Sequence, residues 1–295
     1  MRAVLYLIIA TIFLGLNFHL AKVILKEVNF IEAGFWRFLF GVVALVILGF
    51  RNLPTLQLVI KNIKGIGLTG IIGLFGFNFF FFLGLMNSTA INAALIVSLN
   101  PVLTILFSHR ILKTPIKRTQ IIGISIAFIG AIYLIIRGEI LNLYHLQFNY
   151  GDILIFIANV FFALHHVWVK KYSANISSLN FTLLTSLCCL IGFSILTPIY
   201  GMSNITTHSL NFWMAVFGIG CLGTALAYFL WQKGVQIIGA HHAGIYMNIV
   251  PLSAAMFTIF FNESLYKYHL IGGLLIIIGL VITKKKISGI PKTLS

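Results

Sequence analysis

The chain has 295 residues, of which 60% are hydrophobic and only 8% are charged, and its net charge is +15. A soluble globular protein carries about a quarter of charged residues to cover its surface, so this composition excludes a soluble fold and predicts an all-α, polytopic membrane protein. The basic residues form short clusters between apolar runs, which argues against the single basic patch of a nucleic-acid-binding protein.

Apolar runs of membrane-spanning length divide the whole chain. A helix that crosses the hydrocarbon core of a bilayer needs about 20 mostly apolar residues. The first run follows Arg2 as in a signal peptide, but no small-residue cleavage site precedes Lys22, so we interpret it as an uncleaved first helix. The sequence predicts ten transmembrane helices, at 3–21, 33–50, 66–85, 91–108, 120–136, 151–169, 179–199, 211–231, 242–261 and 268–283.

The distribution of positive charge predicts the orientation. Cytoplasmic loops carry an excess of Lys and Arg. With the N-terminus inside, fifteen of the twenty basic residues fall on the inner side, and Arg37 lies within the second run. We therefore expect an even number of spans, a location in the cell (inner) membrane and both termini in the cytoplasm. The four basic residues left on the outer side are Lys22, Lys26, Arg137 and Lys267.

An internal repeat divides the chain into two halves. Glycine, alanine and proline positions recur 150 residues later and then 149 residues later, which predicts one five-helix repeat over 1–140, a second over 148–285 and a basic cytoplasmic tail over 286–295. Five is odd, so the second repeat crosses the membrane inverted, as in many secondary transporters. The recurring pairs are Gly84 and Gly234, Ala93 and Ala243, Pro101 and Pro251, Gly123 and Gly272, and Gly130 and Gly279.

Several short motifs resemble those of a known family. They are the stretch 14–18 followed by Lys22, the arginine-phenylalanine pair at 37–38, and the stretch from Ala243 through Pro251 and Glu263 to Gly272. Together they resemble the ten-helix EamA type of the drug/metabolite transporter superfamily. That resemblance implies a carrier for small organic solutes without a cofactor. The chain departs from the pattern where leucine replaces the usual tryptophan at 14, asparagine replaces glycine at 262, and threonine stands at 114 in place of glutamate.

Polar residues within the apolar runs predict a binding site near the bilayer centre. Pro101 and Pro251 lie near the middle of the fourth and ninth runs, where a proline frees a carbonyl and favours a hinge facing protein or a wet cavity. A polar side chain within a span is a functional candidate by default, although a structural hydrogen bond between helices is the alternative for each. The predicted substrate-binding residues are Asn17, His19, Asn78, Ser98, Asn100, Asn159, His165, Tyr228, Trp231, Tyr246 and Asn248.

Lys22 and Arg37 have two competing interpretations. They line an outer mouth that attracts a carboxylate, or they anchor the helices by reaching the outer interface. No acidic residue lies at the midplane, so we expect facilitated diffusion or exchange, with histidine-linked proton coupling as the second choice. A neutral cavity behind a cationic mouth suits amino acids or related metabolites, with export as the expected direction and alternating access as the mechanism.

Other functions are less well supported. A membrane enzyme or a metal site would need an acidic partner near the pairs His165-His166 or His241-His242, and none is close in sequence, so we expect neither catalysis nor a metal. A non-transporting receptor or assembly subunit stays open as the alternative. Glycines in the fifth and tenth runs fit close helix packing within one chain or a homodimer contact.

Overall fold

The computed structural model describes residues 2–88, 93, 96–145, 149–260 and 266–284, and this part of the chain consists of helices and connecting turns, without a strand. The predicted all-α membrane fold is confirmed, because six helical stretches are long and apolar enough to cross a bilayer. These stretches are Arg2–Ile24, Phe30–Asn52, Leu56–Asn87, Tyr150–Tyr172, Ser178–Tyr200 and Leu210–Ile238.

The helices of the two halves follow one another in the same order. The first half contains α1 (Arg2–Ile24), α2 (Phe30–Gly49), η1 (Phe50–Asn52), α3 (Leu56–Gly67), the π-helical segment η2 (Leu68–Phe75), α4 (Gly76–Asn87), α6 (Asn100–Leu112) and α7 (Arg118–Ile135). After η3 (Ile140–His145), the second half contains α8 (Tyr150–Tyr172), α9 (Ser178–Tyr200), η4 (Ile205–Thr207), α10 (Leu210–Phe217), the π-helical segment η5 (Gly218–Leu226), α11 (Ala227–Ile238), α12 (Ala240–Ala243), η6 (Gly244–Asn248), α13 (Ile249–Phe260) and α14 (Lys267–Lys284).

Side-chain caps fix where several helices begin. The Asn29 side chain accepts hydrogen bonds from two backbone N–H groups at the start of α2, and Asn149 forms a capping box with Asp152 at the start of α8. Ser177 and Ser209 cap α9 and α10 in the same way. A cap satisfies N–H groups that have no partner within the helix, so these residues let the chain reverse in a few residues between long apolar helices.

All ten predicted runs overlap helices, with two differences in detail. The third helical stretch begins ten residues before the predicted start at 66, because α3 is amphipathic and exposes Leu56, Ile60 and Ile63 beside basic residues. The fourth and ninth runs are not single helices, since α6 and α13 start in the middle of them. Parts of these two runs and the predicted tail at 286–295 lie outside the described residues.

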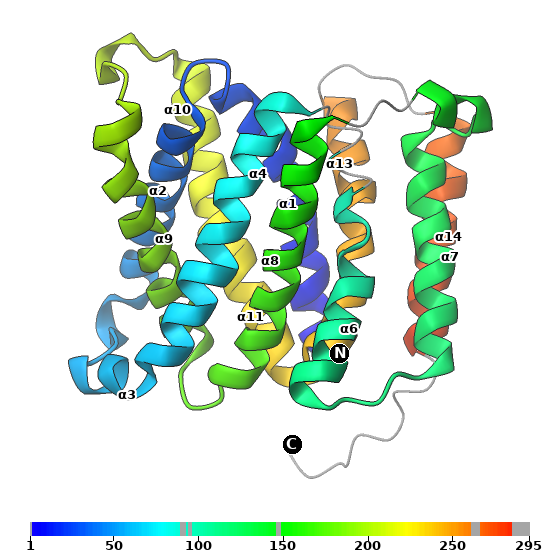
Figure 1. Ribbon diagram of the computed structural model, residues 1–295, viewed down its shortest axis with the longest axis horizontal. Helices are drawn as coiled ribbons and strands as arrows, with labels where there is room; N and C mark the ends of the chain where they lie inside the picture. Colours follow the sequence, from blue (N-terminus) through cyan, green and yellow to red (C-terminus); the bar gives the residue numbers. More distant parts are fainter. Residues whose placement is uncertain (1, 89–92, 94–95, 146–148, 261–265, 285–295) are drawn as a thin grey trace.

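Helix pairing follows the internal repeat. The first helix of each half packs on the third and fourth helical stretches of the other half: α1 contacts α11 and α13, and α8 contacts α4 and α6. The two second helices, α2 and α9, pack on each other, as do the two last helices, α7 and α14. Exchanging the halves therefore leaves this pattern of contacts unchanged. Figure 1 shows α7 and α14 side by side at the right edge of the molecule.

Glycines bring α7 and α14 into close contact within one chain. A Cβ atom added to Gly130 would lie 2.8 Å from the Gly272 carbonyl oxygen, and one added to Gly279 would lie 2.4 Å from that of Gly123. Small residues allow such backbone approach in membranes. These glycines were predicted to serve close packing within one chain or a homodimer contact, and the structure contains the packing within the chain.

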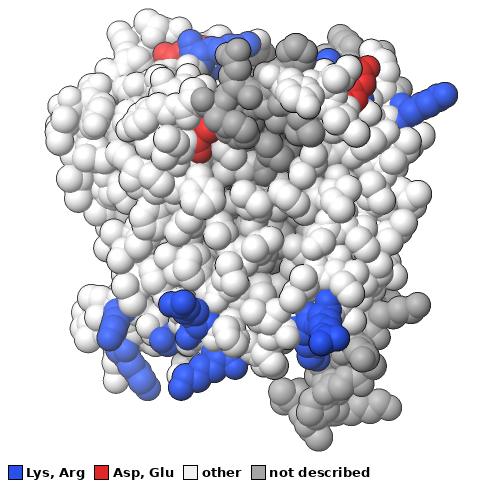
Figure 2. Space-filling model, turned by 45° about the vertical axis from the view of Figure 1, so that its right-hand side comes forward, with Lys and Arg blue, Asp and Glu red and all other residues white. Residues whose placement is uncertain are grey.

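The two ends of the helical bundle differ in charge. The loops after α2, α6 and α8 lie at the lower end of the molecule in Figure 1, where α1 begins and α14 ends. Figure 2 shows Lys and Arg without Asp or Glu at this lower end, which we call the basic face. The visible Asp and Glu lie at the upper end, which we call the acidic face although further Lys and Arg lie beside them. Between the two faces the visible surface carries no charged side chain, and helices there expose Ile71, Ile129, Ile195 and Ile277. This apolar belt is what a lipid bilayer requires.

Candidate functional site

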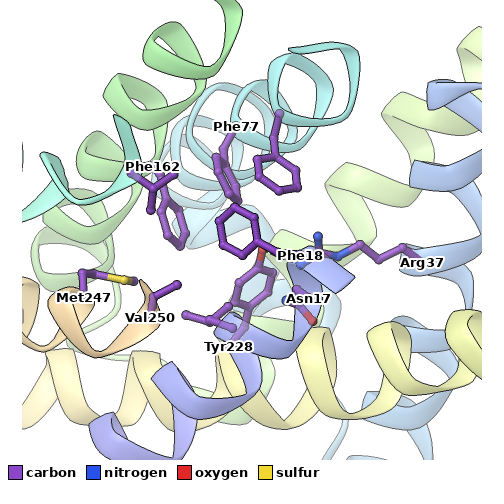
Figure 3. A pocket seen from close by; sticks show the side chains of 11 residues that line it. Asn17, Phe18, Arg37, Phe77, Phe162, Tyr228, Met247 and Val250 are labelled. Atoms are coloured by element: carbon purple, nitrogen blue, oxygen red, sulfur yellow. Dashed lines mark hydrogen bonds between the residues drawn. The ribbon is translucent and has the colours of Figure 1, made fainter. Parts of the chain in front are cut away.

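A small cavity lies among seven helical elements in the interior of the bundle (Figure 3). Its volume is ≈ 30 Å³, which is room for about one water molecule. This space is too small for an organic solute, so binding one requires the helices or their side chains to move apart. The cavity is lined by Leu14, Asn17 and Phe18 of α1, Arg37 of α2, Phe77 and Phe81 of α4, Val97, Phe162 of α8, Tyr228 of α11, Met247 of η6 and Val250 of α13.

Arg37 is the one buried Lys or Arg among the described residues, with 1% of its surface exposed. Its Nε donates a hydrogen bond to the Thr224 hydroxyl (2.9 Å) and its Nη2 donates to the Tyr228 hydroxyl (3.0 Å). The guanidinium also lies 5.6 Å from the centre of the Tyr228 ring. No described carboxylate lies within ion-pair distance of it. Burying a charge without a counter-ion costs several kcal/mol, so this arrangement favours an anionic guest.

The outer-mouth prediction placed Lys22 and Arg37 together, but the structure separates them. Lys22 is exposed near the end of α1. Arg37 does not reach the interface, because both of its hydrogen-bond partners lie inside, on η5 and α11. Figure 3 shows the Arg37 side chain pointing from α2 toward Asn17 and Tyr228. The cation found by sequence reasoning thus belongs to the cavity wall.

Side chains from opposite halves bond to the two π-helical segments. Asn17 donates to the Gly223 carbonyl of η5 (3.2 Å), and His165 Nδ1 lies 3.2 Å from the Thr69 carbonyl oxygen of η2. π-helical turns interrupt the regular hydrogen-bond ladder and occur often at functional sites. The approach needs glycine, because a Cβ at Gly223 would lie 1.7 Å from Asn17 Oδ1. A Cβ at Gly73 would lie 2.9 Å from His165 Cβ.

The predicted binding residues differ in how many of their polar atoms are hydrogen-bonded. Asn100 donates to Asn159 Oδ1 (2.7 Å), and Asn159 donates to the Ile96 carbonyl (2.7 Å), so this amide pair holds the broken helix to α8. His19 Nε2 lies 2.9 Å from the Ala254 carbonyl oxygen. Buried polar atoms without a partner remain on five other predicted residues: Asn17, Asn78, His165, Trp231 and Asn248.

Only three predicted residues line the cavity: Asn17, Arg37 and Tyr228. Together with Thr224 they form what we call the arginine cluster. The other predicted residues, among them the buried Ser98 and Tyr246, lie outside the cavity lining. Sequence reasoning missed Thr224, a neighbour of Arg37, because threonine is unremarkable in an apolar run. A comparison of α1 with α8 at an offset of 148 residues would have matched Asn17 with His165.

The two prolines occupy helix starts. Pro101 is the second residue of α6, after a turn at Ser98 and Leu99. Pro251 is the third residue of α13, directly after the 3-10 segment η6. Proline lacks a backbone N–H, but in the first turn of a helix that N–H would have no partner within the helix. The predicted breaks in the middle of the two runs are therefore points where one helix ends and a new one begins at a proline. Val97 and Met247, four residues before each proline, both line the cavity.

A polar cluster lies at the acidic face. His208 Nδ1 lies 3.5 Å from Glu27 and its Nε2 lies 3.5 Å from Glu32. The hydroxyl of Ser203 donates to Glu32, and that of Ser209 donates to Glu27. The Ser209 bonds lower the pKa of the Glu27 carboxyl below its ordinary value. These five residues, the acidic-face cluster, tie the loop after α1 to the loop after α9. No three His, Cys, Asp or Glu side chains in the described part of the chain group as a metal site.

The chain is similar to membrane transporters over nearly its whole length. The model of the EamA-like transporter family matches residues 1–136 and 149–284. Two Bacillus subtilis (strain 168) proteins, each named an uncharacterized transporter, are similar: YyaM is 33% identical and covers 96% of this chain and 93% of its own length, and YetK is 27% identical and covers 97% and 88%. A solved crystal structure shares the fold, with a TM-score of 0.79, 18% identity, and coverage of 96% of this chain and 98% of the other.

Proposed function

The chain belongs to the EamA-like transporter family, and from this premise we propose that it is a secondary transporter for small organic solutes that carry a carboxylate, such as amino acids and related metabolites. The observation that carries the proposal is Arg37, a buried cation on the cavity wall with hydroxyl partners and no described carboxylate beside it. Arginine suits a carboxylate because its planar fork presents two parallel donors.

The proposed cavity accepts the rest of such a solute as an apolar body. Phe18, Phe77, Phe81 and Phe162 surround the cavity, and apolar walls with a few placed polar groups are typical of small-molecule sites. The unpaired Asn17 Oδ1 beside Arg37 is an acceptor for the ammonium group of an amino acid. A zwitterion therefore satisfies both residues without bringing a net charge into the membrane.

We further propose that the chain crosses the cytoplasmic membrane ten times, as two inverted five-helix repeats with both termini inside, and works by alternating access. Three observations support this arrangement: the basic face, the two family matches along the chain, and the pattern of helix contacts, which is the same when the two halves are exchanged. The helix starts at Pro101 and Pro251 serve as hinges, because the breaks before them need no intact helical ladder. With no described acidic side chain near the cavity, we favour facilitated diffusion or exchange, with export as the direction.

Flux in proteoliposomes tests this function. Purified protein is reconstituted, and uptake and counterflow are measured for the twenty L-amino acids and for matched amines and methyl esters that lack the carboxylate. We expect carboxylate solutes to be carried and their esters and amines to be refused. Arg37→Gln should lower transport about a hundredfold, since a hydrogen-bonded charge contributes a few kcal/mol, and Arg37→Lys should retain part of the activity.

The matched control is Arg51→Gln, which makes the same chemical change at an exposed position on the basic face. This variant should transport normally. Unchanged KM and kcat in Arg37→Gln would refute the carboxylate site. Absence of flux for every solute, with folded protein in the vesicles, would favour a non-transporting receptor or assembly subunit.

A further inference from the structure

A second polar cluster lies beyond the cavity, toward the basic face. It consists of five fully buried residues, and we call it the histidine cluster: His165 and His166 of α8, Thr185 of α9, and Trp231 and Gln232 of α11. The helices that carry it repeat those of the arginine cluster, since α8 and α9 begin 148 residues after α1 and α2. At that offset His165 corresponds to Asn17, and Thr185 corresponds to Arg37.

The two clusters lie at matching depths from opposite faces. Asn17 lies seven residues before the end of α1, and Arg37 lies seven residues after the start of α2, both counted from the acidic face. His165 lies seven residues before the end of α8, and Thr185 lies seven residues after the start of α9, both counted from the basic face. Seven residues of helix span about 10 Å. The repeat thus places one polar cluster beneath each face.

The histidine cluster contains many polar atoms without a partner. They are His165 Nε2, both ring nitrogens of His166, Trp231 Nε1 and Gln232 Oε1, all of them buried. The side-chain hydrogen bonds of the cluster are that of His165 Nδ1 with the Thr69 carbonyl and that of Gln232 Nε2, which donates to the Thr185 hydroxyl (3.5 Å). The Thr185 hydroxyl itself donates to the Phe181 and Thr182 carbonyls of its own helix. Unbonded buried polar groups are rare in native proteins, and each needs an explanation such as a ligand or ordered water.

One aromatic side chain lies between the two clusters. Phe162 lines the cavity, and its ring centre is 4.3 Å from that of His166 and 6.5 Å from that of Tyr228. On its other side it stacks on Phe77 at 4.1 Å. The rings of His165 and Tyr228 also lie 6.4 Å apart, so the two clusters adjoin each other at the wall that Phe162 forms.

We propose that the histidine cluster is a second solute-binding subsite, reached from the cavity when the Phe162 ring moves aside. This inference rests on the proposed function and narrows its substrate class. The cluster has no Lys or Arg, so it does not compete with Arg37 for the carboxylate. It offers the Trp231 N–H as a donor and Gln232 Oε1 as an acceptor, and a neutral group that both donates and accepts satisfies both. The solute therefore carries a carboxylate and an amide or hydroxyl group.

The first test compares L-glutamine with L-methionine, which has a similar length but lacks the amide. Kinetics are measured in proteoliposomes for the wild type, for Trp231→Phe and for the matched control Trp168→Phe, which alters a half-buried ring of α8 outside both clusters. We expect wild type to prefer glutamine. Trp231→Phe should raise the KM for glutamine about fivefold, the effect of one hydrogen bond, and leave that for methionine unchanged. A purely structural Trp231 would give equal kinetics for both variants, because its N–H has no partner to lose.

The second test reads binding without transport. Trp36, Trp168 and Trp213 are replaced by phenylalanine, so that Trp231 alone reports by fluorescence in lipid nanodiscs. Its emission should change saturably with glutamine and not with methionine. If Arg37-dependent transport of glutamine occurs while both the emission and the Trp231→Phe kinetics stay unchanged, the subsite is overturned and the proposed function stands. If no carboxylate solute is carried or bound, both proposals fail together.

Discussion

Replacing Asn100 and Asn248 by leucine, one at a time, separates an amide that holds the fold from one that is free to meet a solute. Both lie at a break in repeat-related runs, Asn100 at the start of α6 and Asn248 at the end of η6, and both were predicted to bind substrate. Asn100 donates to Asn159 and accepts from the Thr104 hydroxyl (3.1 Å). Asn248 is equally buried, but neither its Oδ1 nor its Nδ2 has a partner. We expect the two variants to fail in opposite ways.

The magnitudes follow from the bonds that each change removes. Asn100→Leu removes three buried hydrogen bonds, one of them a long one to the Asn159 carbonyl (3.4 Å), and leaves Asn159 Oδ1 without its donor. We expect a cost of about 1–3 kcal/mol on the scale measured between membrane helices. At roughly 2–4 °C for each kcal/mol, the unfolding midpoint falls by about 5 °C. Asn248→Leu removes no bond and takes an unpaired amide out of the interior, so its midpoint stays level or rises by about 2 °C.

Two measurements on the same purified samples check this. Thermal unfolding is followed by size-exclusion after heating, and transport is measured for each folded molecule in vesicles. Asn100→Leu should lower the midpoint and keep its flux, whereas Asn248→Leu should keep its midpoint and lose about tenfold in flux. A drop in midpoint for Asn248→Leu, or a loss of flux for folded Asn100→Leu, would refute the reasoning from unpaired atoms.

Three further predictions concern close packing and pH. Gly223→Ala should destabilise the protein by about 1–3 kcal/mol through overpacking, and adding Asn17→Ala should restore its midpoint, because the clash is with the Asn17 amide; failure of the double variant to recover would contradict this. Gly73→Ala should not be rescued by His165→Ala, because the nearest atoms are Cβ and Cα of His165, and recovery of the midpoint would count against it. The Glu27 pKa is lowered in the folded state from 4.5, so its contribution is full above about pH 4.5 and is lost as pH falls further; Glu27→Gln should flatten the pH dependence of the midpoint there, and an unchanged slope would show that Glu27 is not the group.

Much of the fold could be predicted because the constraints are coarse and strong. A helix in lipid must be long and apolar, and basic residues mark one of the two faces. The positions and the order of the apolar runs could therefore be predicted without knowing how the side chains pack. The start of α3 was placed too late, because an amphipathic helix such as Leu56–Gly67 is less apolar than a span. The π-helical segments η2 and η5 were not predicted, because their apolar sequence does not distinguish them from α-helix, and the bonds they receive from Asn17 and His165 come from the opposite half.

The sequence predicted a polar site among the apolar helices, but most of the residues predicted for it do not line the cavity. Midspan polarity marks a residue as costly to bury, but it does not say whether another helix supplies a partner. Asn100 and Asn159 bond to each other across the interface of α6 and α8, which no single run reveals. Arg37 was expected near the surface because it is close to the start of its run. Its burial depends on Thr224 and Tyr228, nearly 190 residues away in sequence.

The position of Arg37 also has an electrical consequence. Its helix starts at the acidic face, and seven residues of rise place the Arg37 backbone about 10 Å below that start, in a protein whose hydrocarbon layer would be about 30 Å thick. A unit charge at that depth senses part of the transmembrane voltage, which is worth about 2.3 kcal/mol for each 100 mV across the full thickness. In the proposed carrier, an empty site holds this charge uncompensated, and a bound monocarboxylate cancels it. For such a monocarboxylate, voltage acts on the return of the empty carrier and leaves the loaded step nearly untouched. A zwitterionic amino acid adds no net charge, so the carrier loaded with it stays as sensitive to voltage as the empty one.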